Sequence, residues 1–85
     1  MKKAAVLMME GFEESETITI VDLLMRCGIE AKTFCFQDDL YVRSMQNMTI
    51  KADDRFSDDI KTYDALIIPG GRQAWQRLIA RQDVL

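Results

Sequence analysis

The chain has 85 residues, of which 48% are hydrophobic and 29% charged, as in an ordinary folded domain. It contains no histidine, which excludes an imidazole general base, a Ser/His or Cys/His nucleophile pair and a His-rich metal site within these residues. Its 11 Lys and Arg are outnumbered by 14 Asp and Glu, for a net charge of −3, whereas nucleic-acid binders need clustered cations.

The first half of the chain alternates strand and helix patterns. Residues 3–9 are an apolar run ending at Glu10-Gly11, which predicts a central strand buried on both faces. Residues 15–27 carry apolar side chains at 18, 21, 24 and 25, the spacing of a helix face, and Gly28 follows as a C-cap. Residues 29–36 predict a second strand.

The second half repeats the alternation after an irregular stretch. Residues 41–42 and 48–52 predict a short hairpin around residues 44–47, and residues 53–60 predict a polar connection with one helical turn. Residues 63–68 predict a strand that stops at Pro69-Gly70-Gly71. Residues 74–79 have helical spacing, and residues 83–85 resemble the opening of another element.

This alternation predicts an α/β fold with a mainly parallel sheet and right-handed crossovers. The expected strand order is second, first, third. Parallel sheets are covered on both faces, and the predicted helices are too few for that. The third strand would leave an apolar edge open, so we expect these 85 residues to be one part of a larger fold.

Several classes of site and location are not expected. No apolar run approaches the roughly 20 residues of a membrane helix, and the N-terminal apolar stretch ends at Glu10 without a cleavage site, which predicts a cytoplasmic protein. Cys27 and Cys35 have neither zinc nor disulfide-framework spacing and are expected to be buried structural thiols. The aspartates of residues 53–59 do not match a calcium loop. We expect no metal and no organic cofactor.

Two loops are candidates for chemistry, because ligands of open α/β sheets bind at the carboxyl ends of the strands. The first, residues 10–16, holds four carboxylates and no cation, and would repel a phosphate. Either one glutamate turns inward as a hydrogen-bond partner or proton carrier, or all four are solvated carboxylates at a helix start. The second loop holds Gly70 and Gly71, whose N–H groups either form an oxyanion pocket or simply connect strand to helix.

The same residues carry a resemblance to a known family. Residues 3–7, the Glu-Glu-Ser-Glu-Thr of residues 13–17, residues 21–29, and the Tyr-Asp-Ala-Leu-Ile-Ile-Pro-Gly-Gly of residues 63–71 resemble the ThiJ/PfpI family in register. That family includes the parkinsonism-associated protein deglycase and intracellular cysteine peptidase-like proteins. The resemblance implies a flavodoxin-like three-layer sandwich, related to class I glutamine amidotransferases and incomplete in this chain. Residues 1–85 would be the N-terminal portion of that single domain.

The resemblance also implies catalytic residues. Glu16 would hydrogen-bond a reactive cysteine, and Gly70 and Gly71 would supply oxyanion-binding amides. The cysteine would lie on a nucleophile elbow beyond residue 85, and neither Cys27 nor Cys35 aligns with it. Gln46 stands where several members carry an arginine near the dimer contact.

Two functions are compared on this basis. The first is the N-terminal part of a cysteine-dependent glyoxalase, deglycase, amidase or peptidase-like enzyme acting on a small carbonyl or acyl substrate, with this chain inactive alone. The second is a non-catalytic sensor, chaperone or interaction module that pairs through an exposed sheet edge. The expected partners are a second copy, as a homodimer, or the missing C-terminal half, with no nucleic acid and no membrane.

Overall fold

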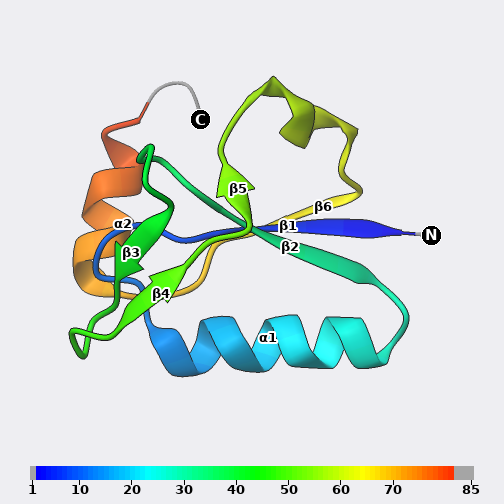
Figure 1. Ribbon diagram of the computed structural model, residues 1–85, viewed down its shortest axis with the longest axis horizontal. Helices are drawn as coiled ribbons and strands as arrows, with labels where there is room; N and C mark the ends of the chain where they lie inside the picture. The colour runs from blue at the N-terminus through cyan, green and yellow to red at the C-terminus, as the bar shows by residue number, and fades with distance from the viewer. Residues whose placement is uncertain (1, 82–85) are drawn as a thin grey trace.

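A computed structural model describes residues 2–81, which form an α/β fold around a four-stranded parallel sheet. The sheet has the order β5-β2-β1-β6 (Figure 1), with all three strand pairs parallel. Its strands are β1 (Lys3–Leu7), β2 (Glu30–Cys35), β5 (Asp54–Arg55) and β6 (Ala65–Ile67). The predicted strand order is therefore confirmed. Because β1 is an inner strand, all of its side chains except the first are buried.

Helix α1 (Glu14–Arg26) follows β1 and lies along one face of the sheet (Figure 1). Its start is fixed by Glu13, whose side chain accepts hydrogen bonds from the N–H groups of Ser15 and Glu16, as an N-cap residue does. Its end is followed by Gly28 at φ +80°. The predicted apolar face contacts the sheet only in part, since Ile18 and Met25 are 52% and 55% exposed.

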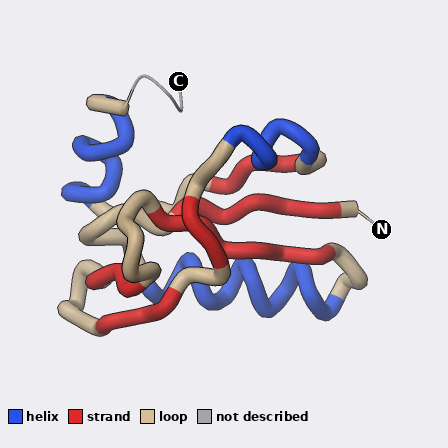
Figure 2. The backbone as a smooth tube through the Cα atoms, turned by 45° about the horizontal axis from the view of Figure 1, so that its top comes forward, coloured by secondary structure: helices blue, strands red, loops and turns tan. Residues whose placement is uncertain are grey.

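The predicted hairpin forms from β3 (Tyr41–Arg43) and β4 (Thr49–Lys51), a separate antiparallel pair. It lies beyond the carboxyl ends of β1 and β2, as Figure 2 shows. Its backbone bonds the turn that follows β1: Gly11 N–H donates to Arg43 O, and Met45 N–H donates to Phe12 O, both at 2.8 Å. The hairpin therefore supports one side of that turn.

The segment expected to be a polar connection contains an additional strand, so this prediction is wrong in part. Strand β5 pairs with the end of β2, and the 3₁₀ helix η1 (Asp58–Thr62) follows on the side of the sheet away from α1 (Figure 1). Asp53 fixes the register, because its carboxylate accepts hydrogen bonds from both the N–H and the hydroxyl of Thr33. Such side-chain bonds form only once the sheet has assembled, so the local sequence pattern did not reveal the strand.

Strand β6 forms the open edge of the sheet, as predicted. It is shorter than expected, and Leu66 is 47% exposed and Ile68 43% exposed around it. After the diglycine turn the chain enters α2 (Arg72–Ile79), which packs Ala74 and Leu78 into the core with Leu7 and Phe34. The element expected at residues 83–85 lies outside the described residues.

The two cysteines differ. Cys35 is buried, as predicted, whereas Cys27 is exposed and its predicted burial is wrong. Cys27 is the C-cap residue of α1, just before the Gly28 turn, and the residues on either side of it, Arg26 and Gly28, are exposed as well. No helix within residues 2–81 has the length and hydropathy to cross a membrane.

Candidate functional site

The two loops that the sequence singled out meet at the carboxyl end of the sheet. Gly70 N–H donates to Glu16 Oε1 at 2.9 Å, and Gly70 O accepts from Glu13 N–H at 2.8 Å. Both bonds join segments more than 50 residues apart in the chain. They arise because β1 and β6 are neighbours in the sheet, so the turns that leave them must lie side by side.

Gly71 is required by this close approach. Its φ of +123° is a conformation that residues with a side chain rarely adopt. A Cβ at this position would overlap Gly11 O and lie 3.1 Å from both Glu13 N and Phe12 Cα, all of them backbone atoms. Within residues 2–81, the Gly71 N–H donates to no acceptor. The turn therefore presents an unused backbone donor at its surface.

The four carboxylates of the first loop have four different environments, so the interpretation that all four are solvated is wrong. Glu10 Oε1 accepts from Gln37 Nε2 at 3.2 Å. Glu13 is the N-cap of α1, and Glu16 is exposed and holds Gly70. Glu14 is the inward-turned residue: it is only 9% exposed, and its Oε2 has no hydrogen-bond partner among the described residues.

This arrangement leaves two polar groups without partners among residues 2–81. The first is the Gly71 N–H, a backbone donor of the kind that can stabilise an oxyanion. Glu16 binds Gly70 through Oε1 only, which leaves Oε2 without a partner among residues 2–81 and available to a thiol. The site as described has no nucleophile of its own. Cys27 lies at the far end of α1, and the buried Cys35 donates its S–H to Gln37 O at 3.3 Å.

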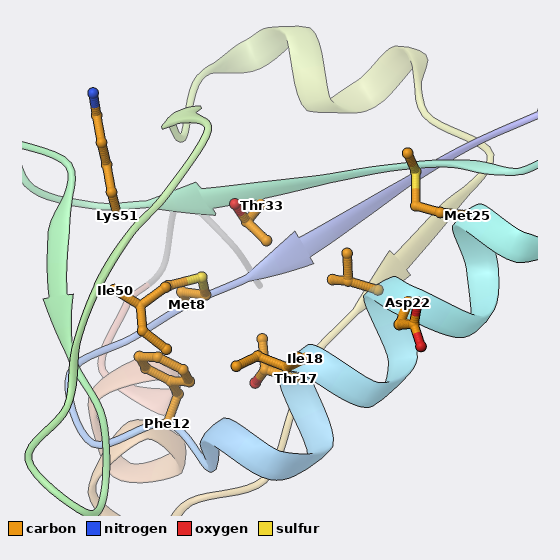
Figure 3. A pocket seen from close by; sticks show the side chains of 10 residues that line it. Met8, Phe12, Thr17, Ile18, Asp22, Met25, Thr33, Ile50 and Lys51 are labelled. Carbon is orange, nitrogen blue, oxygen red and sulfur yellow. The ribbon is translucent and has the colours of Figure 1, made fainter.

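A cavity of about 350 Å³ lies between α1 and the hairpin. In Figure 3, Met8 and Ile50 approach from the sheet side and the hairpin, and Thr17 and Ile18 from α1, with Phe12 at the bottom of the view. The lining is mainly apolar and carries no cluster of nucleophilic or acidic side chains. Elsewhere too, residues 2–81 contain no group of three or more Cys, Asp or Glu side chains arranged to hold a metal ion.

Sequence reasoning assigned no role to Arg72, which directly follows the diglycine. It lines a cavity of about 270 Å³ together with Gly11, Met45 and Gln73. The signal in the sequence was a cation placed immediately after two glycines at a strand end. That signal alone did not distinguish a binding residue from an ordinary exposed arginine.

Comparisons with known proteins show the family and the fold of this chain. The DJ-1/PfpI family model matches residues 2–85. A DJ-1 superfamily protein of Salmonella typhimurium is 36% identical with a TM-score of 0.90, and the alignment covers 99% of this chain and 46% of that one. Oxidized DJ-1 of Toxoplasma gondii is 31% identical with a TM-score of 0.87, covering 96% of this chain and 45% of that one.

A more distant structure shares the fold. DJ-1 of Schizosaccharomyces pombe is 23% identical, with a TM-score of 0.84 over 94% of this chain and 46% of that one. The chain thus spans less than half the length of these three proteins. A family model that matches nearly every residue, together with relatives above 30% identity, confirms the resemblance found in the sequence. The chain belongs to the DJ-1/PfpI family.

Proposed function

We propose that residues 1–85 are the N-terminal portion of a cysteine-dependent enzyme of the ThiJ/PfpI type, acting on a small carbonyl or acyl compound. The observation that carries this proposal is the 2.9 Å hydrogen bond from Gly70 N–H to Glu16 Oε1, which joins a carboxylate to a diglycine turn at a strand end. The nucleophilic cysteine is supplied by the remainder of the protein, on a strand-to-helix elbow.

The proposed reaction begins with attack of the cysteine thiolate on the substrate carbonyl. A C–S bond forms as the carbonyl π bond breaks, and the electron pair moves to the oxygen. The Gly71 N–H stabilises this oxyanion. The Gly70 N–H, which the resemblance also assigned to the oxyanion, is bonded to Glu16 Oε1 in the structure. In this proposal Glu16 is protonated at Oε2, and its O–H donates a hydrogen bond to the cysteine sulfur and orients it. In a glyoxalase or deglycase, the product then forms from this thiohemiacetal. In an amidase or peptidase, the adduct collapses to an acyl-enzyme, and the product forms from that.

The open edge at β6 supports the fragment part of the proposal. An exposed apolar edge strand invites pairing with a further strand, and Leu66 and Ile68 are 47% and 43% exposed there. The matched relatives are more than twice as long as the part that this chain covers. The strand that would pair with β6 is therefore proposed to come from the remainder of the same protein. A non-catalytic module that pairs with another protein through β6 is the second candidate.

We further propose that the complete protein is a cytoplasmic homodimer. Its contact surface is the apolar cavity of Figure 3, which the exposed Ile18 and Met25 line together with Ile50. The cytoplasm is proposed because Cys27 and Cys35 are both free thiols. Sedimentation of the complete protein tests the dimer: Ile18→Asp is expected to convert it to a monomer, and an unchanged molecular mass would contradict this surface.

The enzyme proposal is tested by methylglyoxal consumption. We expect turnover by a version of the protein extended beyond residue 85 and none by residues 1–85. Glu16→Gln in the extended protein should lower kcat/KM about 100-fold. Glu30→Gln serves as the matched control, because Glu30 is an exposed carboxylate at the opposite end of the sheet. Turnover by the short chain, or equal effects of the two substitutions, would contradict the proposal; turnover of an amide in place of methylglyoxal would assign the hydrolase branch.

A further inference from the structure

A second cavity adjoins the diglycine turn on the side of the hairpin. It measures about 270 Å³ and is lined by Gly11, Met45, Arg72 and Gln73. Gly11 lines this cavity and also contacts the diglycine turn, because its carbonyl oxygen occupies the space where a Gly71 side chain would project. The cavity therefore shares Gly11 with the contacts of the diglycine turn.

Arg72 is the charged residue of this cavity, among the described residues that line it. Its side chain is exposed and forms no ion pair within residues 2–81. The four carboxylates of the neighbouring loop disfavour an anion, but none of them forms an ion pair with Arg72 in the described part of the chain. Glu13, for example, accepts from the N–H groups of Ser15 and Glu16 instead. Glu16 in turn is bonded to Gly70 N–H.

The position of Arg72 is also unfavourable for the stability of its helix. It is the first residue of α2, and no acidic residue occupies that first turn. A cation there opposes the helix dipole, which favours anions at the N-terminus. Residues that break a local stability rule without a compensating contact in the fold are often functional. Arg72 is such a residue.

We propose that Arg72 binds the carboxylate of the substrate, so that the substrate class of the site is a small aldehyde or ketone with a carboxylate beside the reacting carbonyl. This inference rests on the proposed function. Arg72 directly follows Gly71 in the chain, so a small substrate whose carboxylate adjoins its reacting carbonyl can contact both residues at once. A guanidinium binds a carboxylate through two parallel hydrogen bonds, which fixes its orientation. The Gln73 carboxamide lines the same cavity and is a further donor.

The first test compares substrates on the extended protein. For wild type, kcat/KM should be higher for glyoxylate than for methylglyoxal, which lacks the carboxylate. In Arg72→Gln the ratio of the two kcat/KM values should fall at least tenfold, and Arg72→Lys should restore part of it. Arg77→Gln is the matched control, because Arg77 is an exposed arginine of the same helix outside this cavity. A ratio in Arg72→Gln within twofold of wild type would overturn the proposal.

The second test does not depend on turnover and so separates this inference from the enzyme proposal. Oxamate, an unreactive carboxylate of the same size, is titrated into the extended protein by calorimetry. Wild type and Arg77→Gln should bind it equally, and Arg72→Gln should bind at least tenfold more weakly. Absence of oxamate binding by wild type, or equal binding by Arg72→Gln, overturns the assignment of Arg72 even if methylglyoxal is consumed. Oxamate binding without any aldehyde turnover supports the anion site and contradicts only the enzyme proposal.

Discussion

Replacing Gly71 by alanine tests whether the close approach of the two turns is built into the fold. The substitution places a methyl group against the backbone of Gly11, Phe12 and Glu13 and forces a residue with a side chain into φ +123°. A sparsely populated backbone conformation costs about 1–3 kcal/mol. Moving the first turn aside also breaks the Glu13 N–H to Gly70 O bond, a further loss of about 1 kcal/mol. We expect Gly71→Ala to lower the free energy of unfolding by about 3 kcal/mol.

The matched control is Gly28→Ala. Gly28 also has a positive φ, +80°, but a Cβ there meets nothing within 4 Å. This variant carries only the conformational cost, about 1 kcal/mol. Urea unfolding followed by circular dichroism measures both variants against wild type. If the two glycine variants lost the same free energy, the turns would not be packed against each other as described, and the geometry of the site would be refuted.

Four further outcomes are expected. Glu13→Ala should lose about 1 kcal/mol of unfolding free energy by urea unfolding, since it removes the N-cap of α1; no loss would contradict the capping role. Glu16→Ala should lose about 1 kcal/mol with the Gly70 bond, and Glu16→Gln less, because its carboxamide oxygen still accepts. Glu14→Met should leave thermal stability unchanged or raise it, because it removes a buried oxygen without a partner; a large loss would reveal a hidden partner. In native protein a thiol reagent should modify Cys27 rapidly and Cys35 only after unfolding; equal rates would contradict their burial.

The sequence was sufficient to predict an element wherever its local residue pattern and its tertiary contacts favour the same structure. The apolar run of β1 and the helix pattern ended by Gly28 fixed both elements to within a few residues. The strand order followed from parallel crossovers, and it brought Glu16 beside Gly70 without knowledge of any side-chain contact. That juxtaposition was predictable because the carboxyl ends of neighbouring parallel strands share one edge of a sheet.

The sequence was insufficient wherever long-range contacts decide the outcome. Strand β5 consists of Asp54 and Arg55, two charged residues without strand propensity, and it is held by the bonds between Asp53 and Thr33. The burial of Glu14 among four adjacent carboxylates depends on how α1 meets the sheet. Cys27 is exposed together with its neighbours Arg26 and Gly28 at the end of α1, where no other element of residues 2–81 covers it.

The most direct measurement is a crystal structure of the protein extended beyond residue 85, solved after its reactive thiol has been alkylated with iodoacetamide. The account predicts that the alkylated sulfur lies within hydrogen-bonding distance of the Glu16 carboxylate, with the added carbonyl oxygen directed at the Gly71 N–H. Alkylation of the exposed Cys27 is expected as well and does not bear on this test. If the reactive cysteine beyond residue 85 instead lay at the opposite end of the sheet, with Glu16 and Gly71 facing solvent only, the account would be contradicted.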